Sequence, residues 1–113
     1  MTVEEHTSAL ESLRHELGAL REHGGIGEQI ADWHRRLVVC LEAVASEFSG
    51  CAAVCAELRA LDYELPPEIE GAIPKGLPDD LIMTHGARVF FRNQCTRAEE
   101  LMRTLLLVLK ATP

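Results

Sequence analysis

Apolar or small residues recur at alternating steps of four and three over the last quarter of the chain. An α-helix places such positions on one stripe, so the spacing predicts a long helix with one packed face, from Asp79 or Asp80 to about Lys110. Either aspartate can serve as its N-cap, and Gly86 could bend it, setting off a short turn at 81–85. The stripe consists of Ala87, Phe91, Gln94, Ala98, Leu101, Leu105 and Val108.

The first half of the chain repeats this spacing. A first helix is predicted over 3–22 with Thr2 as N-cap, and a second begins near Gly27 or Glu28 and stays apolar on one face to Phe48. Residues 51–61 form either a separate short helix or a continuation of the second past a kink. Each apolar stripe must be buried against another, so we predict an all-α bundle of three to four helices in one domain, 1–113.

Two polar residues lie on the predicted stripes. His6 is on the first one, near a helix end, where we expect it to reach water. Gln94 is on the last one, where a single amide can fix the register of a packed seam if a partner satisfies it.

Residues 62–80 form a long connection before the last helix, because Pro66, Pro67, Pro74 and Pro78 exclude a regular helix there. Apolar residues from Tyr63 onward fall on odd-numbered positions only, which would let an extended strap lay one side on the bundle. Two interpretations stay open: a structural crossover, or a partner-binding strap through Asp62, Glu64, Glu68 and Glu70. The acids of this segment are Asp62, Glu64, Glu68, Glu70, Asp79 and Asp80, against Lys75 as its one base.

Composition and charge exclude some classes of partner. The net charge is −7, of which −5 belongs to 62–80, and an acidic chain repels nucleic acid and anionic lipid. The cysteines form no Cys-x-x-Cys pair and no basic-then-apolar leader is present, which favours a reduced, cytoplasmic protein. The longest apolar run, 105–109, is too short for a membrane span of about 20 residues. We therefore expect neither a nucleic acid nor a membrane as partner.

Motifs that carry chemistry are missing. Cys51 and Cys55 are the only closely spaced metal-ligand types, and small buried cysteines explain them better than a zinc site. The glycine-rich segment 24–27 lacks the Lys and Ser/Thr of a phosphate loop, and no nucleophile motif is present. Arg88, Arg92 and Arg103 can share one side of the last helix, but acids lie among them, so we expect an ordinary ion-paired face. The chain is predicted to be no enzyme and to need no cofactor or metal.

One pattern has a parallel among known domains. The segment 33–37, Trp-His-Arg-Arg-Leu, is followed by Leu41 and Phe48, a Pro-rich gap and the apolar helix pattern of 87–107. Over about the last two-thirds of the chain this resembles the small helical domains that accompany prokaryotic antiphage-defence and toxin effectors. Those domains often end the Trp-bearing helix with Phe-Gly, whereas Ser49 intervenes here. The resemblance implies a non-enzymatic partner of an effector and transfers no site residues.

The preferred hypothesis is a non-catalytic protein that acts by association, as a homodimer or in a complex with a larger effector. Leu106, Leu107 and Leu109 spread around more than half of the last helix, so we expect them not all to be covered within one chain, and Leu106 and Leu109 to bind a partner. The alternative is an acidic inhibitor, antitoxin or immunity protein that binds a basic site through 62–80. A helical metal or small-molecule binder is the third possibility.

Overall fold

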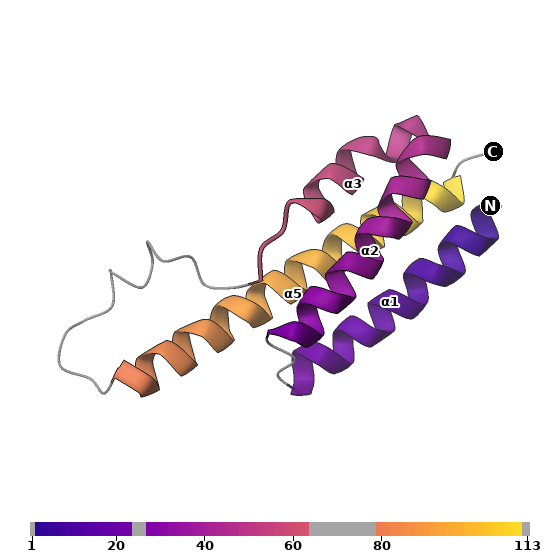
Figure 1. Ribbon diagram of the computed structural model, residues 1–113. Coiled ribbons are helices and arrows are strands. Elements are labelled where there is room, and N and C mark those ends of the chain that lie inside the picture. The colour runs from indigo at the N-terminus through magenta and orange to yellow at the C-terminus, as the bar shows by residue number, and fades with distance from the viewer. Residues whose placement is uncertain (1, 24–26, 64–78, 112–113) are drawn as a thin grey trace.

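The computed structural model describes residues 2–23, 27–63 and 79–111, with only the backbone for 79–85. Every regular element in these ranges is helical, which confirms the all-α prediction (Figure 1). The elements are α1 (Val3–His23), α2 (Glu28–Glu47), the 3-10 turn η1 (Ser49–Cys51), α3 (Ala52–Arg59) and α5 (Asp79–Ala111). The acids Glu64, Glu68 and Glu70 lie outside the described residues.

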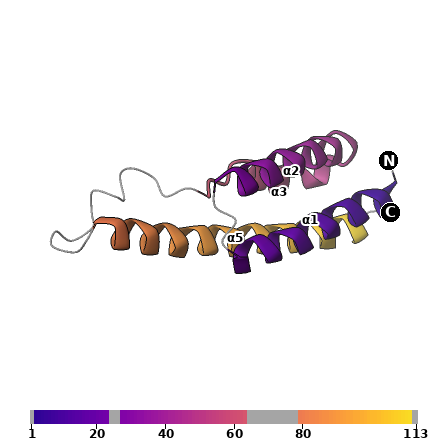
Figure 2. The same cartoon turned by 60° about the horizontal axis from the view of Figure 1, so that its bottom comes forward.

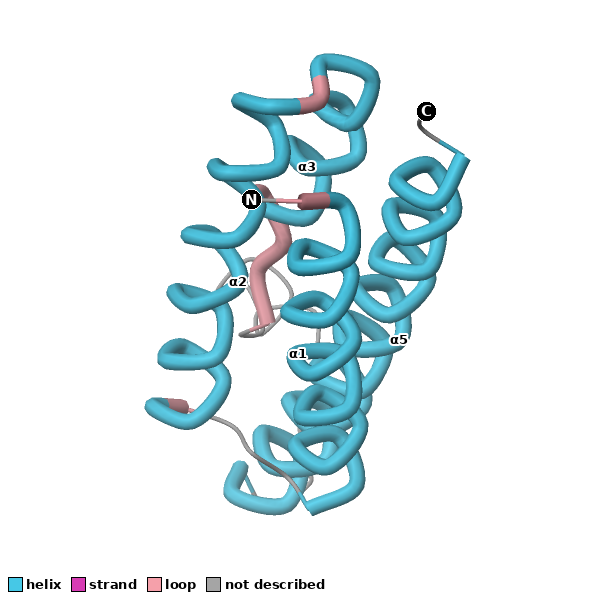
Figure 3. The backbone as a smooth tube through the Cα atoms, turned by 90° about the vertical axis from the view of Figure 1, so that its right-hand side faces the viewer, coloured by secondary structure: helices cyan, strands magenta, loops and turns pink. Residues whose placement is uncertain are grey.

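The helices form an up-down-up-down bundle. α1 packs between α2 and α5, and α3 packs against the same two helices from the other side, so α2 and α5 lie diagonally across the core (Figure 3). Neighbouring helices run antiparallel, and the start of α1 lies beside the end of α5 (Figure 1). Short connections between antiparallel neighbours are typical of such bundles.

Local chemistry fixes the helix ends. The Thr2 hydroxyl accepts a hydrogen bond from the Glu5 amide at 3.2 Å, which confirms Thr2 as the cap of α1. Gly27 precedes α2 with φ at 91°, a left-handed conformation that favours glycine. Phe48 is extended, and the chain reverses through η1. α3 is therefore a separate helix that runs back along α2, not a continuation of it.

The core is made where the stripes meet. Six large hydrophobic residues on the predicted apolar faces are at most 8 % exposed, which confirms that these positions form the core. Cys51, Cys55 and Cys95 are free thiols buried in the same core, in agreement with their interpretation as small hydrophobes. The confirmed core residues are Trp33, Leu37, Leu41, Phe91, Leu101 and Leu105.

Three expectations are wrong. Leu106 and Leu109, which we expected to bind a partner, are 4 % and 0 % exposed, because α1 and α3 flank α5 and bury a stripe wider than a single helix contact. The expectation that not all three leucines are covered is met by Leu107, which is exposed. His6 does not reach water: it is 2 % exposed, bonded to Glu47 at 2.9 Å and stacked edge-on against Phe48. α5 is continuous through Gly86, so 81–85 is no separate turn.

α5 is longer than the bundle it belongs to. It has 33 residues, against 21 in α1, 20 in α2 and 8 in α3. Arg21 of α1 pairs with Glu99, and α1 ends two residues later, so residues 79–96 of α5 lie beyond the end of α1 (Figures 1 and 2). We call residues 79–96 the arm.

Candidate interaction surface

The described residues hold no group of three or more His, Cys, Asp or Glu side chains that could bind a metal ion. Burial raises the pKa of the Cys55 thiol to about 11 and that of Cys95 to about 12. A thiol must ionise to act as a nucleophile, so these two cysteines are poorly suited to covalent catalysis.

The acidic segment is described only at its start. Asp62 is exposed, and its backbone carbonyl accepts a hydrogen bond from Gln94 Nε2 at 2.8 Å. Tyr63 is 6 % exposed and meets Trp33 and His34 edge-on, with ring centroids 6.1 and 5.3 Å away. The first apolar residue of the predicted strap thus lies on the bundle. The side-chain amide of Gln94 thus donates to the backbone of the connection after α3 and not to a side-chain amide of another helix.

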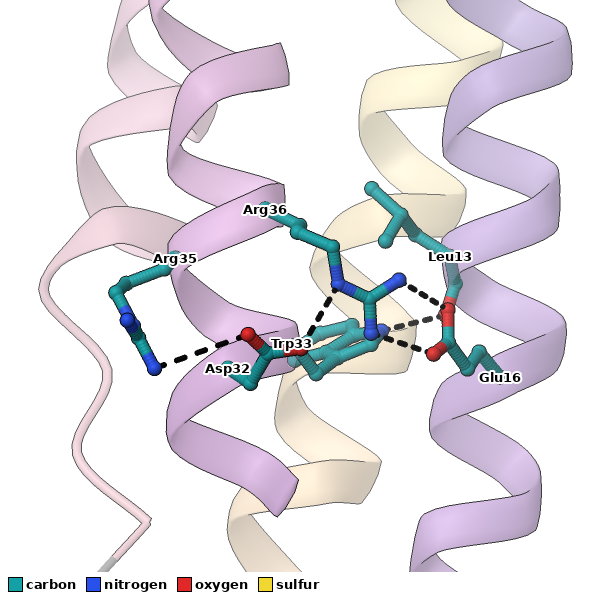
Figure 4. Close-up of polar contacts among 6 residues, drawn as sticks. All are labelled: Leu13, Glu16, Asp32, Trp33, Arg35 and Arg36. Atoms are coloured by element: carbon teal, nitrogen blue, oxygen red, sulfur yellow. Dashed lines mark hydrogen bonds and ion pairs between the residues drawn. The ribbon is translucent and has the colours of Figure 1, made fainter. Parts of the chain in front are cut away.

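Ion pairs neutralise most of the basic side chains of the bundle. Glu99 is shared by Arg21 at 2.6 Å and Arg14 at 3.9 Å, which ties α5 to α1. Arg36 reaches Glu16 with two guanidinium nitrogens, one of them at 2.9 Å, and so links α2 to α1 (Figure 4). The remaining pairs of lysine and arginine side chains in the described residues are Arg21–Glu22, Arg35–Asp32, Arg36–Asp32, Arg59–Glu42, Arg97–Glu57 and Lys110–Glu11.

Three arginines of α5 differ from the others. Arg88, Arg92 and Arg103 are exposed, and none has a carboxylate within 4.0 Å among residues 2–23, 27–63 and 86–111. The expectation of an ordinary ion-paired face is wrong for them. Glu99, one of the acids that lie among them in the sequence, is turned towards α1 and pairs with Arg14 and Arg21. Arg88 and Arg92 both belong to the arm.

The arm also exposes apolar surface. Three large hydrophobic side chains of the described residues are strongly exposed: Val39 on α2 at 68 %, Leu107 at 64 % and Val89 at 45 %. Val89 lies between Arg88 and the half-buried Phe90. The last turns of the arm are covered on one side, where Phe91 and Cys95 are buried. The arm therefore combines exposed apolar and unpaired cationic residues beyond the end of α1.

Grooves elsewhere on the molecule are weaker candidates for a binding site than the arm. A groove of about 410 Å³ between α2 and α3 is floored by Leu41, Ala45, Ala52 and Ala56. Glu42 and Arg59, which also line it, are 3.4 Å apart, so their charges are already paired. Besides this ion pair, the Ser46 hydroxyl also lines the groove.

Sequence reasoning missed the arm as a site, although one signal was present. The predicted last helix of about 30 residues is roughly half as long again as the first two predicted helices, and a bundle cannot cover a helix along the part that extends beyond its neighbours. The position of α1 along α5, which decides which end projects, is marked by the Arg21–Glu99 pair and could not be predicted from periodicity.

No protein-family model, curated protein or solved structure matches this chain. Over the described residues, no helix combines the length and the apolar character needed to cross a lipid bilayer.

Proposed function

We propose that this chain is a non-catalytic helical association protein whose binding element is the arm of α5. In this proposal it acts in the cytoplasm, with itself or as an accessory subunit of a larger effector, the role that the resemblance to effector-associated helical domains implies. Leu106 and Leu109 have no part in it, because they are buried within the chain.

One observation carries the proposal: the arm extends past α1 while remaining helical from Asp79. Isolated helices of about 12 to 15 residues are marginal in water, and most helical stability in proteins comes from packing an apolar face. An exposed Val89 beside a half-buried Phe90 shows that this face is only partly used within one chain. A partner that packs on the arm would stabilise it.

The test compares two exposed valines. Val89→Glu places a charge on the arm, whereas Val39→Glu places the same charge on the outer face of α2, at a site even more exposed. Sedimentation at micromolar concentration should show an assembly that Val89→Glu dissociates and Val39→Glu leaves intact. Circular dichroism checks that both variants keep the wild-type helix content.

Two results would overturn the proposal. The first is a wild-type chain that sediments strictly as a monomer and co-purifies with no other protein. The second is an assembly that Val89→Glu and Val39→Glu weaken equally, since the contact would then not involve the arm.

A further inference from the structure

We infer that Arg88 and Arg92 bind carboxylates on an acidic helix of a different protein, which lies on the arm in line with α1 and in the same direction. The inference rests on the proposed function, because it names the chemistry of a partner that the arm binds. The occupant we expect is an amphipathic helix that carries two carboxylates four residues apart beside its apolar stripe.

A charged stripe runs along the side of α5 that faces α1. Glu99 and Lys110 lie on it and pair with oppositely charged side chains of α1, at 2.6 and 3.5 Å. An α-helix turns by about 100° per residue, so positions 88 and 92 fall within about 40° of these two residues, on the same stripe. Both positions lie past the end of α1 (Figures 1 and 2). The arm thus continues the charged interface between α1 and α5 beyond the end of α1.

The two arginines have no acid to pair with on their own helix. Ion pairs along a helix form three or four residues apart, and the sequence contains no acid between Asp80 and Glu99. Both arginines are exposed, and neither has a carboxylate within 4.0 Å in the parts of the chain whose side chains the structure describes. Arg88 and Arg92 are therefore available to carboxylates from outside the chain.

An acidic helix matches what the arm exposes. Guanidinium groups bind carboxylates through two parallel hydrogen bonds, and Arg36 of α2 binds Glu16 of α1 in this way (Figure 4). Val89 adds apolar surface beside the arginines: it is 45 % exposed and lies about 60° around the helix from Arg92. Residues four apart share one face of a helix, so a single amphipathic helix can offer two carboxylates and an apolar flank together.

The described helices of a second copy do not offer such a pair of carboxylates. Among the side chains that the structure describes, the exposed helix acids without an ion-pair partner are Glu4, Glu5, Glu28 and Glu100. No two of them lie three or four residues apart. Two arms laid together on the arginine side would also bring like charges into contact, which opposes association. The carboxylates are therefore expected on a different protein.

A nucleic acid fits the same arginines less well. The chain has a net charge of −7, which repels a continuous row of phosphates. Within the bundle, this stripe of α5 already pairs with side chains of a neighbouring helix. A helix with two carboxylates brings negative charge only where the arginines are.

The first experiment measures the binding of a designed probe helix. The probe is a capped peptide of about 20 residues, long enough to form a helix, with a leucine stripe flanked by pairs of glutamates four residues apart. Its twin has lysine in place of every glutamate. The glutamate probe should bind the wild-type chain, and Arg88→Glu with Arg92→Glu should weaken this binding by about tenfold or more. The lysine probe should bind the reversed variant more tightly than the wild type.

Arg103→Glu is the matched control for the single reversal Arg92→Glu. Arg103 is also exposed and unpaired on the same side of α5, but it lies between residues that pair with α1. Its reversal should change the dissociation constant of the glutamate probe by less than about threefold. Equal losses in the two single variants would overturn the inference, because the attraction would then come from the overall charge. A wild-type chain that binds both probes equally, or neither, would overturn it as well.

The second experiment locates the probe on the arm. Arg88→Lys with Arg92→Lys keeps the charges and adds amines that a carbodiimide joins to neighbouring carboxylates without a spacer. Mass spectrometry should find the first glutamate of a pair joined to position 92 and the second to position 88, because the probe should run antiparallel to α5, as α1 does (Figure 1). The reverse order would overturn the alignment with α1. An equal yield of cross-links in Arg103→Lys would overturn the assignment to the arm.

The outcomes separate this inference from the proposed function. If Val89→Glu dissociates an assembly of the chain and the glutamate probe does not bind, association through the arm stands and the acidic partner is wrong. If the double arginine reversal dissociates a homodimer with no probe added, a second copy supplies the contact and the inference falls. If a single-stranded oligonucleotide binds Arg88 and Arg92 more tightly than the glutamate probe does, the arginines serve nucleic acid and the inference falls as well.

Discussion

At the scale of single residues, two polar contacts fix how α1 and α2 meet. Trp33 is fully buried, and its Nε1 donates to the Leu13 carbonyl at 2.8 Å (Figure 4). At the other end of the same pair of helices, buried His6 bonds to Glu47. An indole and an imidazole bury a large apolar surface while each keeps a hydrogen bond, so neither leaves a desolvated polar group at this contact.

The His6 contact makes stability depend on pH. The hydrogen bond from His6 lowers the pKa of the Glu47 carboxyl below its ordinary value of 4.5. A carboxyl whose pKa is lower in the folded state stabilises the fold above the unfolded-state pKa, and this stabilisation disappears as the pH falls through the folded-state pKa. Glu47→Gln should therefore flatten the loss of stability below about pH 4.5, measured by urea denaturation between pH 3 and 6. Glu100→Gln, whose exposed side chain pairs with no described residue, should keep the wild-type profile.

At the scale of elements, the short α3 shapes the molecule. α3 ends at Arg59, after 8 residues, while α2 and α5 on either side of it are much longer. Tyr63 lies on the core beyond that end, held by Trp33 and His34 and by the bond from Gln94 to the preceding carbonyl. Burial and the nearby Cys95 raise the pKa of Tyr63, so its hydroxyl stays protonated. That hydroxyl is buried and has no hydrogen-bond partner among the described residues.

Two substitutions of Tyr63 are therefore predicted to differ in their effect on stability. Tyr63→Phe removes an unsatisfied buried hydroxyl and should be neutral or stabilise the fold by up to about 1 kcal/mol. Tyr63→Ala removes the whole ring and should destabilise it by about 3 to 5 kcal/mol. Both values come from denaturant midpoints at constant m. A Tyr63→Phe variant that loses more than about 1 kcal/mol would show that the hydroxyl makes a favourable bond.

The sequence predicted the helices more accurately than the contacts between them. Period and capping residues located the helical segments within a few residues, because Thr2, Gly27 and the apolar stripes act locally, but they left open whether 51–61 was a separate helix. Burial of Leu106 and Leu109 depends on two other helices flanking α5, and burial of His6 depends on Glu47, which is distant in sequence. Such pairings come from tertiary packing, which periodicity does not encode. The arm was missed for the same reason. The length of the last helix could be predicted, but the place beside it where α1 ends could not.

At the scale of the whole molecule, the fold is elongated. Its extents are 57 × 24 × 19 Å, and the radius of gyration is 16.1 Å, against about 13 Å for a compact chain of this length. Much of the excess length comes from the arm, which extends α5 beyond α1. A rod with a single projecting helix at one end can dimerise in two ways that differ in overall length.

Small-angle scattering separates these two arrangements. Two copies that overlap only along antiparallel arms, each about 27 Å long, should have a maximum dimension of roughly 85 Å. Two bundles packed side by side would remain near the 57 Å of one copy. We expect the longer particle at concentrations where the mass is that of a dimer, and the shorter one after dilution or in the Val89→Glu variant. A dimer of the shorter length would place the contact on the bundle, because arms that cross at one end must carry the two bundles apart.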